Sequence, residues 1–290
     1  MRAIAERLKN YMSMVKFSHT VFAMPFALIG FSLATTLTDH DFSLRILLLV
    51  VLCMVLARNA AMGFNRLADR YYDSLNPRTR TREIPAGIIS KKAAIIFIVV
   101  NSVLFMVAAG FINRLTLFLS PAALIIILGY SLTKRFTSLC HFILGLGLSL
   151  APTGAYISVT GEFALLPVIY SLIVVTWVSG FDIIYSLQDD EFDRTNKLYS
   201  LPSSLGRKKA FIISGAVHAV TFVMVIVAGI LGNGGILFWT GAAVFTGLLV
   251  YQHTIVKHDD LSRINLAFGT TNGIASIIFS FFVILDLVVR

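Results

Sequence analysis

The chain has 290 residues, of which 57% are hydrophobic and only 13% are charged, and its mean hydropathy is +0.83. A soluble chain of this length carries about twice that charged fraction, so the composition excludes an ordinary soluble domain. The net charge of +9 is explained by Lys and Arg residues that flank the membrane on one side, and no nucleic-acid partner is expected.

Nine continuous apolar runs approach the ~20 residues that a helix needs to cross a lipid bilayer. They lie at 17–38, 43–66, 91–112, 114–133, 138–157, 165–188, 208–231, 233–252 and 264–288. Because the runs are continuously apolar rather than alternating, they exclude a transmembrane β-barrel. The first run is longer than the apolar region of a cleaved signal peptide, so we expect it to be retained. The sequence therefore predicts an all-α, polytopic membrane protein with nine transmembrane helices.

Lysine and arginine residues lie almost entirely on one side of the predicted bundle. All but four of the 24 fall in segments on the side of the N-terminus; the exceptions are Arg45, Arg114 and Arg290 on the opposite side and Arg58 within the second run. Cytoplasmic loops carry such an excess of positive charge. The distribution predicts insertion in the cytoplasmic (inner) membrane, with the N-terminus in the cytoplasm and the C-terminus outside.

A polar segment begins where the second run leaves the membrane on the cytoplasmic side. In this first acidic segment (residues 65–73), Asn65, Asp69 and Asp73 are four residues apart, so on a helix they share one face. Arg58 lies seven residues before Asn65, on the same face and inside the apolar run. A charge at this depth costs at least ~2.5 kcal/mol, which makes it a functional candidate; the alternative is a structural salt bridge to an acidic residue.

The sixth run ends in the same way. In this second acidic segment (residues 182–193), Asp182, Asp189 and Asp193 repeat the seven-then-four spacing. The correspondence predicts that helices one to four and five to eight form a pseudo-repeat, with helix nine added, within one domain covering residues 1–290. It also predicts that two acidic helix ends meet on the cytoplasmic side.

Residues 76–87, here called the basic loop, follow the first acidic segment. Arg78, Arg80 and Arg82 occupy alternate positions between two prolines, and this arrangement disfavours a helix. We expect an extended segment that folds over a bound anion, although the arginines are equally compatible with a purely topological role. Lys134, at the end of the fourth run, is placed either to reach a phosphate or to extend toward lipid headgroups.

The chemistry of these residue types points to a diphosphate. Mg²⁺ commonly binds through one or two carboxylates together with substrate phosphate oxygens, and arginine and lysine offset the remaining negative charge. The 23 phenylalanines and 9 tyrosines suit an apolar cleft that holds a lipid tail and keeps water from a reactive carbocation.

The two acidic segments resemble the motifs of the UbiA-type intramembrane prenyltransferases, and the resemblance covers essentially the whole chain. It rests on Asn65-x₃-Asp69-x₃-Asp73 with the following Asn-Pro-Arg-Thr, and on Asp182-x₂-Tyr185-x₂-Gln188-Asp189-x₃-Asp193 followed by Ser200. The stretches that begin at Lys16 and at Ala57 resemble the 4-hydroxybenzoate polyprenyltransferase-like branch, which includes menaquinone-pathway members. Many members of the family carry Asp directly after the motif's Asn, where this chain has Arg66.

The resemblance implies Mg²⁺-dependent transfer of a polyprenyl group from polyprenyl diphosphate to a hydroxylated aromatic acid in the bilayer. The acceptor would be 4-hydroxybenzoate or a dihydroxynaphthoate, in ubiquinone or menaquinone biosynthesis. The implied metal-binding and catalytic residues are Asp69, Asp73, Asp189 and Asp193, with Asn65 helping to bind both metal and diphosphate. The implied diphosphate-binding residues are Arg78, Arg82 and Lys134. Candidates for binding the acceptor are Arg58, His19 and Asp182; an interfacial anchor is the alternative for His19.

Two other interpretations remain open from the residues. The same architecture would serve another acceptor, such as haem, homogentisate, a chlorophyllide or a glycerol phosphate ether, although haem chemistry favours more intramembrane histidines than occur here. A transporter would place its polar groups near the membrane midplane. Because this chain concentrates its acidic groups at one surface, a transporter is the less favoured interpretation.

Overall fold

The computed structural model describes residues 2–16 and 23–290, and over this part of the chain it is helical, without a strand. Eight segments are long and apolar enough to cross a membrane. Their helices are α3 (Leu44–Ala68), α5 (Lys91–Gly110), α6 (Arg114–Thr133), α7 (Cys140–Thr160), α8 (Leu165–Ser186), α11 (Arg207–Leu231), α12 (Ile236–Ile255) and α13 (Asn272–Val289). The ninth apolar helix, α2 (Met24–Leu37), is shorter. The first predicted run starts at residue 17, and its residues 17–22 lie outside the described part. The prediction of an all-α polytopic bundle is confirmed; its division into two pseudo-repeats stays a prediction.

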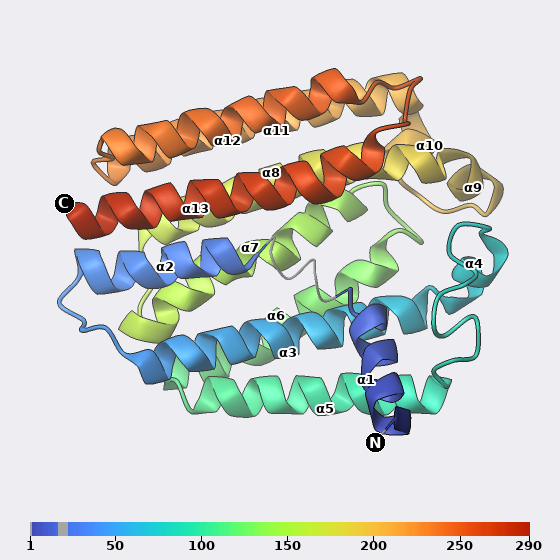
Figure 1. Cartoon of the computed structure of the whole chain (residues 1–290), viewed down its shortest axis with the longest axis horizontal. Coiled ribbons are helices and arrows are strands. Elements are labelled where there is room, and N and C mark those ends of the chain that lie inside the picture. The colour runs from blue at the N-terminus through green and yellow to red at the C-terminus, as the bar shows by residue number, and fades with distance from the viewer. Residues whose placement is uncertain (1, 17–22) are drawn as a thin grey trace.

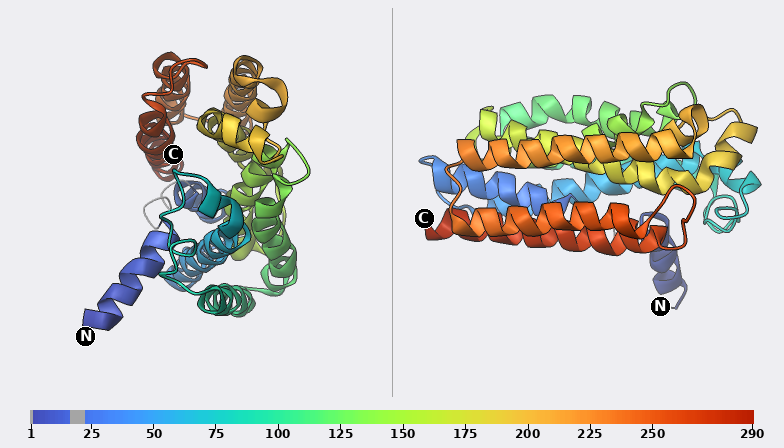
Figure 2. Two further views of the ribbon diagram at one scale, coloured as in Figure 1. Left: turned by 90° about the vertical axis from the view of Figure 1, so that its right-hand side faces the viewer. Right: turned by 90° about the horizontal axis from the view of Figure 1, so that it is seen from above.

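The long helices run side by side, and the short polar elements gather at one end of the bundle (Figure 1). This end holds α1 (Arg2–Met14), which lies across the bundle, together with α4 (Arg70–Leu75), α9 (Asp190–Thr195) and α10 (Leu201–Leu205). The C-terminus lies at the opposite end, and the views in Figure 2 agree with this arrangement. Both acidic segments therefore lie at the same end of the bundle, as the sequence predicts.

Helix α2 is held in the centre of the bundle by close backbone packing and by aromatic rings. A Cβ atom on Gly30 would collide with the backbone of Pro152 in α7, so only glycine allows this approach. From the same helix, Phe26 contacts Trp177 of α8, with ring centroids 5.3 Å apart. Phe245 of α12 stacks on Phe279 of α13 at 4.8 Å. Burial of large aromatic side chains dominates core energetics, and here it fixes α8, the helix that leads into the second acidic segment.

Neither acidic segment is one continuous α-helix, and this corrects the expectation of a single helix face. Helix α3 ends at Ala68, and Asp69 has φ −85° and ψ 2° before α4 begins. The backbone N–H of Asp69 still bonds to the Asn65 carbonyl, and that of Asp73 to the Asp69 carbonyl. In the second segment, α8 gives way to a 3₁₀ turn, η2 (Leu187–Asp189), before α9. Thus the four-residue spacing survives, but the chain bends at Asp69 and near Asp189, where it leaves the apolar layer.

Candidate active site

The first acidic segment combines a carboxylate pair with side chains that orient it. Asn65 donates a hydrogen bond from Nδ2 to Asp69 Oδ2 at 3.1 Å, and Arg135 Nη2 lies 3.5 Å from the other oxygen, Oδ1. Asp73 is buried, and its Oδ1 lies 2.7 Å from Arg82 Nη1. Its second oxygen, Oδ2, is buried without a hydrogen-bond partner among the described residues. This oxygen is therefore available as a ligand.

The basic loop joins the first acidic segment to the second. Arg78 forms a two-point contact with Asp189, with Nη2 2.6 Å from Oδ2 and Nε 3.2 Å from Oδ1. Asn76 donates to Asp189 Oδ1 at 3.3 Å, and its own side-chain oxygen accepts from the backbone N–H of Arg78 at 2.9 Å. Residues separated by more than a hundred positions are thus hydrogen-bonded, so the two acidic helix ends form one polar site.

Asp193 is the most deeply buried carboxylate of the site, with a relative exposure of 0%. Lys134 Nζ lies 2.7 Å from its Oδ1. The carbonyl of Lys134 accepts a hydrogen bond from the backbone N–H of Tyr199 at 2.7 Å, which ties the end of α6 to the loop after α9. The predicted residue Lys134 is therefore directed toward the acidic groups rather than toward lipid.

The basic loop is a series of turns, which corrects the expectation of an extended segment. The carbonyl of Asn76 accepts from the N–H groups of Thr79 and Arg80, and the N–H of Arg82 bonds to the Thr79 carbonyl. The side-chain oxygen of Asn76 accepts from the backbone N–H two residues further on, and such a bond favours a turn. As a result Arg78 and Arg82 pair with carboxylates. Arg80 is exposed, as Arg78 is, but forms no ion pair within the described residues.

The three acceptor candidates have different surroundings. Arg58 donates from Nη2 to the Lys16 carbonyl at 3.2 Å, and no carboxylate pairs with it among the described residues, so the alternative of a salt bridge to an acidic residue is wrong for this part of the chain. Asp182 Oδ2 lies 2.7 Å from His141 Nδ1 in α7. His19 lies outside the described residues. Arg66 is 5% exposed, and its Nη1 lies 3.5 Å from the Asn65 side-chain oxygen.

Burial and neighbouring charge set the protonation of the site outside the spans. Burial, followed by the charge of Asp73, raises the pKa of Asp69 from 3.8 to about 6. Burial acts to lower the pKa of Lys134, but the charges of Asp193, Asp189 and Asp69 outweigh it and raise the pKa above its usual value. Lys134 is therefore a fixed cation near pH 7, whereas Asp69 titrates just below neutrality.

The residue types fit Mg²⁺, and the geometry indicates how it would be held. No group of three or more acidic, histidine or cysteine side chains lies close enough to hold a metal ion alone, over the residues that the structure describes. Mg²⁺ does not require such a cage, because it commonly binds through one or two carboxylates plus substrate phosphates. Within the described part of the chain, the buried Oδ2 atoms of Asp73 and Asp193 have no hydrogen-bond partner. These oxygens and those of Asp69 and Asp189 are the donors that suit the ion.

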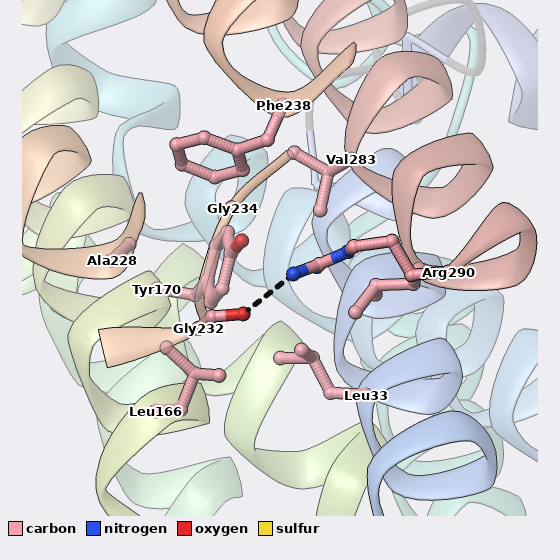
Figure 3. A pocket seen from close by; sticks show the side chains of 10 residues that line it. Leu33, Leu166, Tyr170, Ala228, Gly232, Gly234, Phe238, Val283 and Arg290 are labelled. Carbon is pink, nitrogen blue, oxygen red and sulfur yellow. Dashed lines mark hydrogen bonds between the residues drawn. The ribbon is translucent and has the colours of Figure 1, made fainter. Parts of the chain in front are cut away.

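Two cavities lie at the other end of the bundle. One, of about 10 Å³, is lined by Leu33, Tyr170 and Phe238, and Arg290 beside it donates to the Gly232 carbonyl at 3.0 Å (Figure 3). A space of this size holds no more than a water molecule. The second, of about 270 Å³, is bordered by His40, Asp41 and the loop at Gly161. Both are remote from the acidic segments, so neither belongs to the candidate site.

Comparison with known proteins finds one family over most of the chain. Residues 23–282 match the model of the UbiA prenyltransferase family. The 4-hydroxybenzoate octaprenyltransferase of Nitrosospira multiformis is 31% identical over 249 residues, which cover 85% of this chain and 84% of that protein. The protein of the same name from Aliivibrio fischeri is 29% identical over 235 residues, 81% of this chain and 82% of that protein.

Solved structures share the fold. A UbiA homologue from Aeropyrum pernix, in its apo form, superposes with a TM-score of 0.84 and 32% identity, covering 92% of this chain and 98% of its own. A UbiA homologue from Archaeoglobus fulgidus, solved with DMAPP and Mg²⁺, superposes with a TM-score of 0.73 at 20% identity, over 97% of this chain and all of its own. The expected UbiA-like architecture is confirmed by these similarities.

Proposed function

Because the chain belongs to the UbiA prenyltransferase family, we propose that it transfers a polyprenyl group from polyprenyl diphosphate to 4-hydroxybenzoate in quinone biosynthesis. Family membership makes it a membrane prenyltransferase. The names of its relatives support 4-hydroxybenzoate as the acceptor, with a dihydroxynaphthoate as the other acid to test. The observation that carries the proposal is the pairing of the two acidic segments through Arg78 and Asp189 at one end of the bundle.

Four carboxylates would hold Mg²⁺ with the diphosphate: Asp69, Asp73, Asp189 and Asp193, with Asn65 orienting Asp69. The structure of a UbiA homologue of the same fold was solved with DMAPP and Mg²⁺, which supports binding of the metal together with a prenyl diphosphate. Bound Mg²⁺ supplies charge stabilisation to the leaving diphosphate. In the protein, three of these carboxylates, Asp189, Asp73 and Asp193, pair with Arg78, Arg82 and Lys134 respectively. The same three cations would bind the diphosphate oxygens and stabilise the charge that develops when the prenyl carbon–oxygen bond breaks.

The acceptor would bind on the bilayer side of these groups. Arg58 and Asp182 each lie seven residues before a member of the acidic site, which corresponds to roughly 10 Å along a helix. Arg58 is a permanent cation without a carboxylate partner in the described part of the chain, and a guanidinium binds a carboxylate through two parallel hydrogen bonds. We assign Arg58 to the carboxylate of the aromatic acid, with His19 as a further candidate.

The charge distribution supports a position of this site on the cytoplasmic side of the membrane. The basic and acidic loops share one end of the bundle with the N-terminus, and the excess of Lys and Arg there matches a cytoplasmic face. We therefore infer a multi-pass protein of the cytoplasmic membrane with its active site on the cytoplasmic side. Cysteine accessibility to a membrane-impermeant reagent, with single cysteines at exposed Arg80 and at Asp41 near the other end, tests this orientation.

The direct test is an assay of membranes that contain the protein. Membranes are incubated with Mg²⁺, a long polyprenyl diphosphate and either 4-hydroxybenzoate or a dihydroxynaphthoate, and the lipid product is identified by mass spectrometry. We expect a prenylated 4-hydroxybenzoate that requires Mg²⁺ and is absent in the Asp69→Ala and Asp189→Ala variants. Prenylation of neither acid, or product formation that persists in both variants, would overturn the proposal.

A further inference from the structure

The contact between Asp182 and His141 lies outside the metal and diphosphate groups, and it orients a carboxylate inside the bundle. His141 is 2% exposed and lies at the start of α7. Its Nδ1 is 2.7 Å from Asp182 Oδ2 in α8, and its Nε2 is 3.3 Å from the backbone nitrogen of Leu201 in α10. One imidazole thus joins three helices.

The backbone of Leu201 fixes the tautomer of this imidazole. A backbone N–H can only donate, so Nε2 of His141 accepts and carries no proton. The ring proton is then on Nδ1, from which it is donated to Asp182 Oδ2. Such a bond holds the carboxylate in one rotamer, in the way that a neighbouring group orients an imidazole in hydrolytic triads.

The second oxygen of Asp182 is left open by this arrangement. No hydrogen bond reaches Oδ1 among the described residues, and the Asp182 side chain is 22% exposed, whereas that of His141 is 3% exposed. A carboxylate within an apolar span is costly. Because His141 holds one oxygen of Asp182 and the other is open, the carboxylate can accept a proton on the open oxygen.

The position of Asp182 along α8 agrees with such a role. It precedes Asp189 by seven residues, which is roughly 10 Å along a helix. A diphosphate held at Asp189 would leave its reacting carbon, and the ring that attacks it, on the bilayer side of that residue. A carboxylate there repels a diphosphate but stabilises the positive charge that appears on the prenyl carbon and then on the ring.

We propose that Asp182, oriented by His141, is the general base that removes the ring proton of the prenylated aromatic acid. This rests on the proposed function. The prenyl C1–O bond breaks, and its electron pair leaves with the diphosphate. A ring carbon next to the hydroxyl uses its π electrons to form the new bond to C1. The proton on that carbon passes to Asp182 Oδ1, and the C–H electron pair restores the aromatic ring. Asp182 is the catalytic residue here, and His141 is a positioning residue.

The test uses 4-hydroxybenzoate deuterated at both ring positions next to the hydroxyl, compared with the unlabelled acid. In the wild-type protein we expect nearly equal rates, because ionisation of the diphosphate limits turnover. In Asp182→Asn we expect kcat to fall on the order of 10²-fold, the loss typical of a missing general base. The deuterated acid should now react more slowly than the unlabelled acid, since proton removal becomes limiting.

Further variants separate positioning from folding. His141→Gln, whose amide can still donate and accept, should show a smaller loss of kcat with the same isotope effect. Ser179→Ala removes a hydrogen bond to the His141 carbonyl at the same helix interface and leaves the imidazole intact, so it should resemble wild type. Asp182→Glu, which keeps a displaced carboxylate, should also increase the isotope effect and serves if Asp182→Asn does not fold. Retained Mg²⁺-dependent binding of a prenyl thiodiphosphate identifies folded variants.

The outcomes are distinct. If folded Asp182→Asn or Asp182→Glu turns over without an increased isotope effect, Asp182 is not the base, although the proposed function stands. The same holds if only the KM for the acid changes. If the wild-type protein prenylates neither aromatic acid, the proposed function fails and this inference fails with it.

Discussion

Arg78 and Asp189 form a two-point ion pair that joins the basic loop to the end of α8, with Nη2 2.6 Å from Oδ2 and Nε 3.2 Å from Oδ1. Each side chain is partly exposed, at 37% and 14%, so the pair itself adds little to stability. The pair instead holds the Arg78 guanidinium beside the proposed diphosphate position.

Arg78→Ala should weaken use of polyprenyl diphosphate. Hydrogen bonds to charged groups contribute about 1.5–3 kcal/mol, so we expect kcat/KM for the diphosphate to fall about 10- to 100-fold. Arg78→Lys should recover only part of it, because an ammonium cannot make the two-point contact. Arg80→Ala is the matched control: Arg80 lies two residues away, is exposed, and should stay near wild type. Equal losses for Arg78 and Arg80 would mean that the loop acts only through its net charge.

The raised pKa of Asp69, about 6, predicts an acidic limb in the pH profile. Mg²⁺ needs the carboxylate, so kcat/KM should fall as the pH drops through about 6, and more Mg²⁺ should move the limb to lower pH by competing with the proton. Arg135 lies 3.5 Å from Asp69 and lowers its pKa. Arg135→Gln should therefore shift the limb to higher pH. A limb that stays fixed, or shifts to lower pH, contradicts the assignment.

Protonation of Asp69 changes stability and activity in opposite directions: it lowers kcat/KM but raises the free energy of unfolding. Because the folded pKa of Asp69 exceeds the unfolded value of 3.8, the folded state binds the proton more tightly. The contribution of Asp69 to the free energy of unfolding is therefore fully present below pH 3.8 and is lost as the pH rises through about 6. Chemical unfolding in detergent at pH 5.0 and 7.0, with Asp69→Asn as the control, measures this difference.

Hydropathy and charge were sufficient to predict the long helices, since crossing a bilayer requires long apolar runs regardless of tertiary contacts. The four-residue spacing likewise indicated that Asn65 and Asp69 are neighbours, as their hydrogen bond confirms. The spacing did not indicate the bends at Asp69 and near Asp189. These bends occur where the chain leaves the apolar layer, and there loop contacts rather than periodicity determine the backbone.

Pairings between distant segments were not predictable in the same way. Asn76 bonds Asp189 across more than a hundred residues, and no local pattern distinguishes Asn76 from an ordinary turn residue. His141 was missed for a related reason: it lies alone at the start of an apolar helix, and its partner Asp182 is on the next helix. A polar residue at matching depth in each of two adjacent spans is the signal that would have linked them.

Lys134 Nζ lies 2.7 Å from Oδ1 of Asp193, which at 0% exposure is the most buried carboxylate of the site. Lys134→Met should lower the free energy of unfolding by about 3 kcal/mol, because it leaves a buried carboxylate unpaired. The double variant Lys134→Met/Asp193→Asn removes both charges and should recover most of that loss while remaining inactive. Thermal unfolding in detergent, combined with the prenylation assay, separates the two effects. A double variant no more stable than Lys134→Met would show that the pair's charges are not the cause.

Asn272 allows the packing of the bundle to be tested separately from catalysis. Its side-chain oxygen accepts hydrogen bonds from Trp177 Nε1 at 3.0 Å and from Gln252 Nε2 at 2.8 Å, and the residue is 0% exposed. Asn272→Leu would leave two buried donors without an acceptor, each costing about 1–3 kcal/mol. We therefore expect a clearly lower melting temperature in detergent, with little change in the KM values of the protein that stays folded.

Asn265 provides the control. It lies seven residues earlier and is exposed before the π-helical turn Leu266–Thr271, so Asn265→Leu should leave the melting temperature unchanged. Equal melting temperatures for the two variants would show that the Trp177–Asn272–Gln252 contacts do not support the packing of α8 against α12 and α13.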